Sequence, residues 1–518
     1  MLDLGTSFLA AVERDPGAVA IVDADLRLSY AEWYRRISSL SAGLEALGLR
    51  KGDHLLTLLQ NRWQAATLHW ACQMNGIIMT PLNWRATAED VTYCISDAEI
   101  RAVVYEESSA AAIAGAEGVG GLPRIVLGAP GAAEMGFDAL CASGAPDALP
   151  RATAEDWSVM LYTSGTTSRP KGVPRRHRAE RAGAIAHVAQ NLYRRAERTL
   201  GVMPLYHTMG VRSLLAMSLI GGTFVCLPRF DVAAALKLIE GERITNLYLV
   251  PTLYHDMLAH PGFAASDVSS VRKLGFAGAS MTDGLLNRLA EAFRPELFVN
   301  HYGSSEVYTC TIEQDAVRKP GSAGKSGLNQ RIRVVKLGSP DTPAAPGEEG
   351  QIAAALAGDE AFEGYWRRPD ADAKSLRDGW YLTGDTGYFD AEGDLFVTGR
   401  VDDMIITGGE NVSPVEIESC LSLHPAVSEV AVVGLPDERW GRIVVAFVRL
   451  NAEASPDELD RHCRESGLAN FKRPRRFVIV GELPRSPVGK LLRRKLVEGD
   501  YIPATPFPAK NPAEEPTA

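Results

Sequence analysis

The sequence has few cysteines, no long apolar run and no excess of basic residues. Its seven cysteines are scattered without a C-x-x-C pair, which excludes an ordinary zinc cluster, and an odd number does not suit a disulfide framework. We therefore expect reduced thiols in a cytoplasmic protein. No segment approaches the roughly 20 apolar residues that span a bilayer. The N-terminal residues lack the basic patch and apolar stretch of a secretory signal, so we expect none.

Net charge argues against one class of function, and length indicates how many domains to expect. The net charge of −10 argues against a nucleic-acid surface, which needs a basic face. A hydrophobic content of 46% and a charged content of 23% are those of a soluble globular chain. A chain of 518 residues is too long for one ordinary core, and we expect at least two domains.

A hydroxyl-rich turn follows a short apolar run, Val159–Tyr162, that is typical of a buried strand. The turn contains Thr163, Ser164, Gly165, Thr166, Thr167 and Lys171. Backbone N–H groups of such a turn form a concavity for anions, and the hydroxyls and the lysine add donors. The pattern differs from the P-loop, in which Gly-Lys precedes Ser or Thr directly. Taken alone, the turn is also consistent with a solvated surface loop.

Four further segments occur downstream in order: Tyr302–Glu306, Tyr381–Asp385, Gly399–Asp403 and Pro484–Lys490. With the hydroxyl-rich turn, they resemble the signatures of the acyl-adenylate-forming family, which includes acyl- and aryl-CoA ligases, luciferases and peptide-synthetase adenylation domains. The resemblance covers nearly the whole chain. Two departures leave the local geometry open: Ser168 stands where most members carry glycine, and Val488 stands where Ser or Thr is usual.

The expected fold class is α/β, because helical and strand patterns alternate along the first part of the chain. Strands are predicted at Ala18–Val22 and Leu55–Leu59, and a helix at Tyr30–Gly48. The resemblance implies a large multi-sheet N-terminal domain (1–400) and a small, mobile α+β C-terminal domain (401–500), with the hinge at Asp402. A proline-rich tail, 501–518, is expected to be disordered.

Two local predictions concern the C-terminal domain. Ser413, Pro414 and Glu416 form the pattern of a capping box at the start of a helix. A second helix is predicted over Leu491–Leu496, directly after Lys490.

The resemblance implies where ATP binds. The predicted ATP- and AMP-binding residues are Thr163, Ser164, Gly165, Thr166, Thr167, Lys171, Tyr302, Gly303, Ser304, Ser305, Asp385 and Arg400. The Tyr302 ring would lie on adenine. Asp385, whose two carboxylate oxygens suit the hydroxyls of a ribose, would otherwise be a structural cap in a turn.

The predicted catalytic residues are Lys490, Glu306 and His207. Glu306, with Thr166, would hold the Mg²⁺ bound to ATP, since magnesium prefers few carboxylates together with phosphate oxygens. A lysine at position 490 would ordinarily be a solvated surface residue, and its catalytic role rests on the resemblance.

The resemblance also places the acyl group and CoA. The predicted acyl pocket consists of His207, Thr208, Met209, Gly278, Ala279 and His301. The predicted CoA-binding residues are Arg85, Gly408, Gly409, Trp440, Phe471 and Arg473. Taken alone, a single histidine is usually a core residue, and basic runs such as Lys472–Arg476 are often a solvated face.

The expected function is that of an ATP-dependent carboxylate–CoA ligase. The substrate would be a small aromatic or heteroaromatic carboxylate such as benzoate, a substituted benzoate or a furoate, as used in aromatic acid catabolism. Thr208 and His301 favour an oxygen-bearing or heteroaromatic ring. ATP, Mg²⁺ and CoA are the expected cofactors and co-substrates, with no nucleic acid and no membrane span, and a homodimer is left open.

Two rival functions stay open. A medium-chain fatty acid is the nearest alternative substrate. A stand-alone adenylation domain would load a carrier protein instead of free CoA, and the basic residues near the predicted CoA site favour free CoA.

Overall fold

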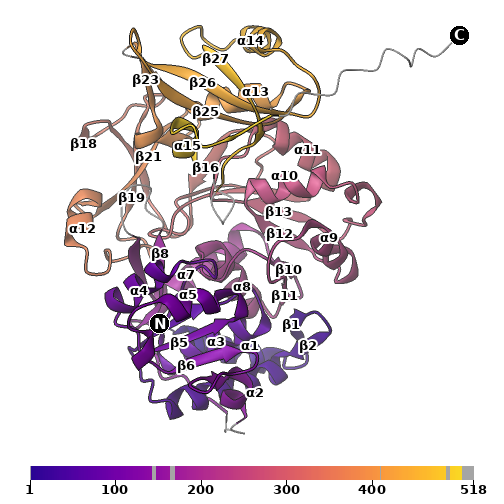
Figure 1. Ribbon diagram of the computed structural model, residues 1–518, viewed down its shortest axis with the longest axis vertical. Coiled ribbons are helices and arrows are strands. Elements are labelled where there is room, and N and C mark those ends of the chain that lie inside the picture. The colour runs from indigo at the N-terminus through magenta and orange to yellow at the C-terminus, as the bar shows by residue number, and fades with distance from the viewer. Residues whose placement is uncertain (1, 143–146, 164–169, 409, 486–490, 505–518) are drawn as a thin grey trace, which may run out of the picture. The chain divides into compact units, whose positions relative to one another are not determined.

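The computed structural model describes residues 2–142, 147–163, 170–408, 410–485 and 491–504, apart from the side chain of Asn411. The chain folds into two compact units. The large unit comprises residues 1–279, 289–383 and 388–396, and the small unit comprises residues 280–288, 384–387 and 397–518. The mixed α/β architecture, with a large and a smaller part, confirms the predicted fold class (Figure 1).

The first sheet of the large unit is parallel except at one edge. Its strand order is β7-β6-β5-β3-β4-β8-β9, and only the β8–β9 pair is antiparallel. The strands are β3 (His54–Leu58), β4 (Ile78–Pro81), β5 (Ala102–Glu106), β6 (Arg124–Leu127), β7 (Met135–Gly136), β8 (Trp157–Thr163) and β9 (Lys171–Arg176).

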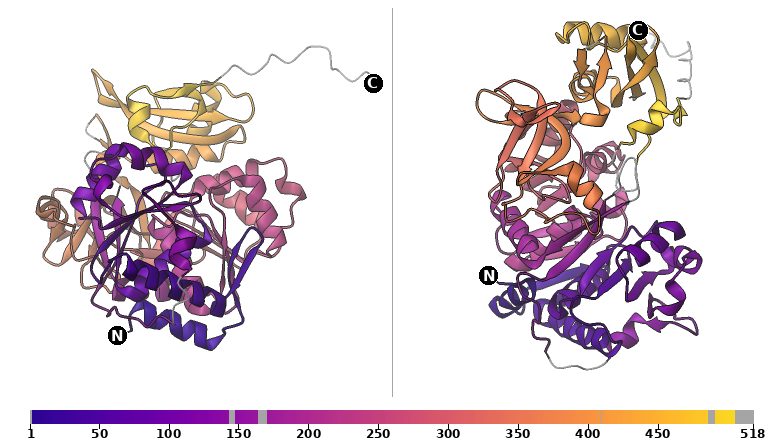
Figure 2. Two further views of the ribbon diagram at one scale, coloured as in Figure 1. Left: turned by 60° about the horizontal axis from the view of Figure 1, so that its bottom comes forward. Right: turned by 90° about the vertical axis from the view of Figure 1, so that its left-hand side faces the viewer.

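Helices cover both faces of this sheet, as the buried strands of a parallel sheet require (Figures 1 and 2). Leu55 and Val104 face one core, and their neighbours Leu56 and Val103 face the other. The helical segments around them are α1 (Leu4–Arg14), α2 (Tyr30–Ala46), α3 (Trp63–Asn75), α4 (Ala88–Asp97), η1 (Glu107–Ser109), α5 (Ala110–Gly115), η2 (Val119–Gly121) and α6 (Phe137–Cys141).

The second sheet of the large unit has a parallel centre, in the order β14-β13-β12-β10-β11-β1. Its strands are β1 (Val19–Asp23), β2 (Leu26–Ser29), β10 (Arg198–Gly201), β11 (Thr223–Cys226), β12 (Asn246–Leu249), β13 (Lys273–Phe276) and β14 (Leu297–Tyr302). Its helices are α7 (His177–Gln190), α8 (Thr208–Ile220), α9 (Val232–Gly241), α10 (Pro251–Ala259) and η3 (Phe263–Ala265). The next helix, α11 (Asp283–Phe293), has its first residues, up to 288, in the small unit and the rest in the large unit.

Beyond β14 the chain becomes antiparallel. The later strands and helix are β15 (Thr311–Glu313), β16 (Ser322–Ser326), β17 (Ile332–Lys336), β18 (Ser339–Pro343), β19 (Gly350–Ala355), α12 (Pro369–Ser375), β20 (Leu376–Arg377), β21 (Trp380–Phe389) and β22 (Leu395–Arg400).

The small unit contains a four-stranded sheet in the order β25-β26-β27-β28. One face carries Val430 and Val432 against helices α13 and α14, and the other carries Val433 and Phe447. Its elements are η4 (Val401–Asp403), β23 (Ile405–Thr407), β24 (Glu410–Val412), α13 (Pro414–Ser422), β25 (Val427–Asp437), β26 (Gly441–Leu450), α14 (Pro456–Glu465), β27 (Arg476–Glu482), α15 (Arg493–Val497) and β28 (Ile502–Pro503).

The predicted capping box at residue 413 is wrong, although the helix begins where predicted. Ser413 is the N-cap, but its side chain accepts no hydrogen bond from the helix. Its hydroxyl donates instead to the carbonyl of Thr398, and Glu416 pairs with Lys472 at 2.6 Å. Longer-range partners therefore replace the local cap. The second predicted helix begins two residues late, at Arg493.

Among the described residues, no helix is both long and apolar enough to cross a membrane.

Candidate active site

The turn after β14 places the predicted residues Tyr302 to Glu306. The Ser304 hydroxyl accepts hydrogen bonds from the backbone N–H groups of Glu306 (3.2 Å) and Val307 (3.3 Å), which tightens the turn. The Tyr302 hydroxyl donates to Thr383 Oγ1 at 3.3 Å. The turn thus holds Glu306, which is 94% buried, in a fixed position.

Gly303 is required by the close approach of the backbone in this turn. A Cβ atom at position 303 would lie 2.1 Å from the carbonyl oxygen of Tyr308. We expect Gly303→Ala to displace the turn, to destabilise the large unit by about 1–3 kcal/mol and to abolish measurable pyrophosphate release from ATP. Thermal unfolding and a pyrophosphate-release assay measure the two effects. Gly241→Ala is the matched control, because a Cβ there meets nothing within 4 Å, and an equal loss in both variants would contradict the role of Gly303.

Tyr365 joins the predicted metal ligand to the predicted phosphate-loop lysine. Its hydroxyl donates to Glu306 Oε1 at 2.8 Å, and the Lys171 ammonium lies 3.8 Å from the centroid of its ring. Burial, followed by the negative charge of Glu306, raises the pKa of Tyr365, so the phenol keeps its proton and donates. Sequence reasoning missed Tyr365, since a single tyrosine after glycine carries no signal of its own.

The contacts of Glu306 fit the predicted magnesium site. A single buried carboxylate, with phosphate oxygens as the other ligands, is a coordination that Mg²⁺ accepts. Thr163, at the end of β8, pairs with Lys171 across the β8–β9 ladder, and its hydroxyl donates to the Lys171 carbonyl at 3.4 Å. Thr163 and Lys171 thus lie opposite each other at the ends of β8 and β9, and Lys171 and Glu306 both contact Tyr365.

Arg175 supports the Glu306 turn by donating to its backbone and was also missed by sequence reasoning. Its side chain is fully buried, and its Nε donates to Glu180 at 2.9 Å. Its Nη1 donates to the backbone carbonyls of Glu306 (3.1 Å) and Glu360 (2.7 Å). In the sequence, Arg175 lies within a basic run (Arg175, Arg176, Arg178) that is typical of a surface.

The predicted acyl wall begins at the N-terminus of α8. Asn61 fixes the preceding loop by donating to the carbonyls of Gly201 (2.9 Å) and Met203 (2.6 Å) and accepting from Leu205 N–H (3.0 Å). His207 is the N-cap of α8, and its Nδ1 accepts from Met209 N–H at 3.4 Å.

The other predicted acyl residues lie in the same unit. Thr208, Met209 and His301 are buried. Gly278 and Ala279 follow β13, and Gly278 adopts the left-handed conformation (φ 83°) that favours glycine. His301 directly precedes Tyr302 on β14, so the predicted acyl and adenine contacts share one strand.

Asp385 and Arg400 form an ion pair in the small unit, with Arg400 Nη1 2.8 Å from Asp385 Oδ1. Both residues are predicted to bind ATP and AMP, and in this structure Arg400 pairs with the carboxylate predicted for the ribose hydroxyls. Asp402, the predicted hinge, lies in η4 and is exposed.

The predicted CoA residues of the small unit fall into two groups. Gly408 donates its N–H to the Trp440 carbonyl at 3.0 Å, and Trp440 and Phe471 are 43% and 40% exposed, so both rings are available for stacking. Arg473 donates to Asp460 (3.0 Å) and Asn470 (2.6 Å). In the large unit, the Arg85 guanidinium lies 3.9 Å from the centroid of the Trp84 ring.

Several predicted residues lie outside the described part of the chain: Ser164, Gly165, Thr166, Thr167, Ser168, Gly409, Val488 and Lys490. The same holds for residues 505–518 of the predicted disordered tail.

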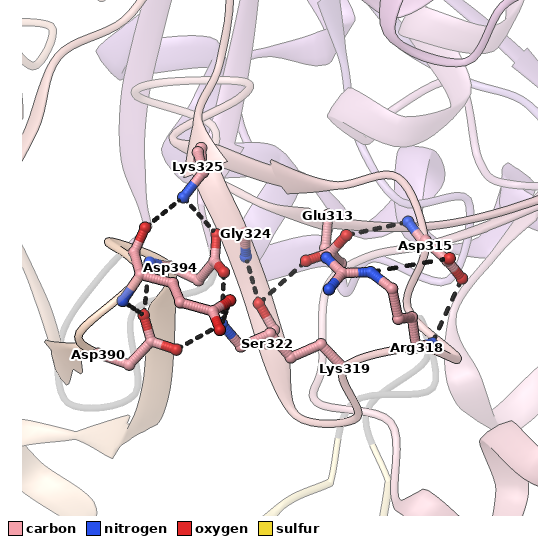
Figure 3. Close-up of polar contacts among 10 residues, drawn as sticks. Glu313, Asp315, Arg318, Lys319, Ser322, Gly324, Lys325, Asp390 and Asp394 are labelled. Atoms are coloured by element: carbon pink, nitrogen blue, oxygen red, sulfur yellow. Dashed lines mark hydrogen bonds and ion pairs between the residues drawn. The ribbon is translucent and has the colours of Figure 1, made fainter.

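An acidic group away from the predicted site is a salt-bridge network (Figure 3). Carboxylate oxygens of Asp390, Glu392 and Asp394 lie within 4.8 Å of one another. The Lys319 ammonium contacts all three carboxylates, and Lys325 contacts Asp394 at 2.9 Å. The three carboxylates raise the pKa of Lys319, which keeps it charged. Each of the three carboxylates is already paired with a lysine, so we assign the group no metal.

Comparisons with known proteins show the family to which the chain belongs. Residues 8–366 match the family model of AMP-binding enzymes, and residues 416–490 match the AMP-binding enzyme C-terminal domain. The chain is 36% identical over 512 residues to a 4-chlorobenzoate–CoA ligase of Arthrobacter sp., covering 97% of this chain and 96% of that protein. It is 32% identical over 481 residues to a long-chain-fatty-acid–CoA ligase of Mycobacterium tuberculosis, covering 92% and 93%.

The fold of the chain is also similar to that of a solved structure. The crystal structure of an anthranilate CoA ligase in complex with anthranoyl-AMP superposes with a TM-score of 0.89 at 25% identity, covering 96% of this chain and 97% of that one.

Proposed function

We propose that this chain, which belongs to the AMP-binding enzyme family and is an ATP-dependent carboxylate–CoA ligase, acts on a small aromatic or heteroaromatic acid. The observation that carries the substrate class is the similarity to 4-chlorobenzoate–CoA ligase over 97% of the chain. The buried polar residues Thr208 and His301 of the predicted acyl wall support a ring that carries a heteroatom.

The reaction proceeds in two steps because a carboxylate is a poor acyl donor. A carboxylate oxygen of the substrate attacks the α-phosphorus of ATP, and the bond from that phosphorus to the oxygen that bridges it to the β-phosphorus breaks. Pyrophosphate leaves, and an acyl-AMP is formed. The CoA thiolate then attacks the acyl carbon, and AMP leaves as the thioester forms.

In our proposal, the residues around Tyr365 serve the first step. Two anions must meet, so fixed positive charge and donors are needed at the phosphates. Lys171 donates to the phosphates, and Glu306 would hold a magnesium ion, which would supply further positive charge there. The proton that Tyr365 donates keeps Glu306 oriented.

Lys490 and the small unit complete the proposal. Lys490 approaches the α-phosphate during adenylation. Rotation of the small unit about Asp402 then withdraws Lys490 and brings Gly408 and the CoA-binding residues into position for the second step. Such a rotation is a hinge motion, in which a few residues absorb the change in backbone dihedral angles.

The variant Asp402→Pro tests the hinge. Proline fixes φ, so we expect pyrophosphate release at the parent rate but a loss of thioester formation of about 10²-fold, as for a misplaced reactant. Single-turnover assays of each half-reaction measure the difference. Asp402→Ala, which leaves φ free, is the control and should make thioester normally. If the proline variant makes thioester at the parent rate, residue 402 is not the hinge.

A substrate screen tests the proposed function as a whole. Pyrophosphate release is measured with benzoate, substituted benzoates, 2-furoate, coumarate and octanoate, each with and without CoA. We expect the highest kcat/KM with a ring acid, and a thioester product only when CoA is present. A clear preference for octanoate would assign the chain to fatty acids. Adenylation with no CoA thioester would favour the loading of a carrier protein.

The cellular setting is part of the same proposal. We place the enzyme in the cytoplasm because all seven cysteines are free thiols. Sedimentation of the purified chain distinguishes a monomer from a homodimer.

A further inference from the structure

A cluster of five buried polar side chains lies in the large unit beside the predicted acyl wall. It consists of His187 on α7, Asn191 just after α7, Arg212 on α8, Tyr248 on β12 and His301 on β14. Each is at least 97% buried. The three rings contact one another, with centroid distances of 5.1 Å (His187–His301), 4.7 Å (His187–Tyr248) and 5.0 Å (Tyr248–His301).

Asn191 fixes the hydrogen positions on both histidines. Burial, together with the positive charge of Arg212, lowers the pKa of both His187 and His301 well below the usual value, so both rings are neutral. The Asn191 amide donates to His187 Nδ1 (3.0 Å) and to the His187 carbonyl (2.8 Å). His187 therefore carries its proton on Nε2.

The carbonyl oxygen of the same Asn191 amide fixes the proton position on the His301 ring. Asn191 Oδ1 lies 3.1 Å from His301 Nε2. An amide oxygen only accepts, so His301 donates from Nε2, and its Nδ1 presents a lone pair.

Four atoms of this cluster lack hydrogen-bond partners among the described residues. They are Nε and Nη1 of Arg212, Nε2 of His187 and Nδ1 of His301. Arg212 forms no ion pair within the described part of the chain, and its guanidinium lies 4.9 Å from the centroid of the Tyr308 ring. Buried polar groups without partners are costly and rare in proteins. This cluster therefore contains three nitrogen donors and one lone pair without partners among the residues described, and we infer that a ligand binds them.

The cluster adjoins residues that the proposed function assigns to the acyl group. Arg212 lies four residues after Thr208 on α8, on the same helical face. His301 itself belongs to the predicted acyl wall and precedes Tyr302 on β14. A ring whose carboxylate points toward the nucleotide has its far side available to this cluster.

We propose that the cluster binds an oxygen atom in or on the ring of the acyl substrate. Arg212 and His187 donate to that oxygen, and where the oxygen carries a hydrogen, His301 Nδ1 accepts it. This inference rests on the proposed function and specifies its substrate class as ring acids whose oxygen lies away from the carboxylate, such as furan-3-carboxylates and 4-hydroxybenzoates. A halogen or an aliphatic chain would leave the donors unpaired.

The charge balance favours a neutral oxygen over a second carboxylate. The buried Glu360 and Arg212 act with opposite sign on the pKa of Tyr248, which burial itself raises. A second carboxylate on the substrate would add a negative charge near the buried Glu360, whereas a neutral oxygen would not.

Matched substrate pairs test the proposal with the full-length enzyme. We would compare kcat/KM for pyrophosphate release with 3-furoate against thiophene-3-carboxylate, and with 4-hydroxybenzoate against 4-methylbenzoate. At least one oxygen-bearing acid should exceed its partner by about tenfold or more, because a site built to hydrogen-bond an oxygen rejects the analogue without it. The pair that shows the preference distinguishes a ring oxygen from a hydroxyl.

The variant Arg212→Met should bring that ratio close to one while activity on the oxygen-free partner persists. A merely structural role of Arg212 would lower both activities and leave the ratio unchanged. Arg212→Lys keeps the charge and should retain part of the preference. Arg195→Met, at a 60% exposed side chain, is the control and should leave the ratio as it is.

Three outcomes would overturn the inference. They are the absence of any oxygen preference in the parent enzyme, an unchanged ratio in Arg212→Met, and a higher kcat/KM for terephthalate than for either oxygen-bearing acid. The comparison in the parent enzyme decides the question even if Arg212→Met does not fold. Activity without oxygen preference refutes this inference alone, whereas the absence of pyrophosphate release with every carboxylate refutes the proposed function as well.

Discussion

The Lys490→Ala variant is expected to lose acyl-adenylate formation while it still converts supplied acyl-AMP to thioester. In the first step, the carboxylate and the α-phosphate are both negative, and the ammonium of Lys490 offsets the charge that builds up between them. Loss of one such preorganised donor costs about 10²–10³-fold in rate. In the second step, our proposal places Lys490 away from the reacting atoms, so its removal should matter little. Lys490 lies outside the described residues, and the prediction rests on its place in the Pro484–Lys490 segment.

Single-turnover measurements of each half-reaction check this expectation. Pyrophosphate release is followed with the acid and ATP, and thioester formation with synthetic acyl-AMP and CoA. Lys495→Ala is the matched control, because Lys495 is close in sequence, 47% exposed and paired only with Asp500 among its described contacts. Equal losses in both half-reactions of the Lys490 variant would refute the division of labour between the two steps.

The strands and helices whose patterns are strong could be predicted from the sequence. The predicted strands at Ala18–Val22 and Leu55–Leu59 correspond to β1 and β3 within one residue, and the helix at Tyr30–Gly48 corresponds to α2. In these segments the apolar residues that are buried recur at the spacing of a strand or of a helix. The capping box failed because Ser413 and Glu416 each have a partner distant in sequence, and no local pattern records such partners.

The candidate site was predictable only where its residues belong to a motif. Glu306 and Lys171 were found because each lies within a recognisable segment, and the structure connects them through Tyr365. Tyr365 itself comes from the loop before α12, about 60 residues beyond Glu306 and outside every signature.

The buried polar cluster could likewise be predicted only in part from the sequence. Arg212 is the only charged residue of the mostly apolar helix α8, and a single arginine suggests a surface position. Its burial is a property of how α8 packs in the large unit. Sequence reasoning found His301, whose neighbours belong to a motif, and missed Arg212 and His187, whose neighbours do not.

Arg175→Met is expected to produce the largest loss of stability among the variants considered. Arg175 and Glu180 are both fully buried, and Tyr308 adds a hydrogen bond to Glu180 at 3.0 Å. Removing one member of a buried ion pair leaves the other charge uncompensated, which costs about 3–5 kcal/mol. The change also removes the donors to the carbonyls of Glu306 and Glu360, so pyrophosphate release should fall together with stability.

The neighbouring residue provides a stringent control for this prediction. Arg176 follows Arg175 on β9, but its side chain is 24% exposed and pairs with Glu363, which is 38% exposed. Exposed pairs contribute about 0–1 kcal/mol, so Arg176→Met should lower the midpoint of urea unfolding only slightly. The double variant Arg175→Met with Glu180→Gln removes the orphaned charge and should recover part of the loss. If the Arg175 and Arg176 variants unfold at the same urea concentration, the buried pair does not support the Glu306 turn, because two adjacent arginines would then differ in burial without differing in effect.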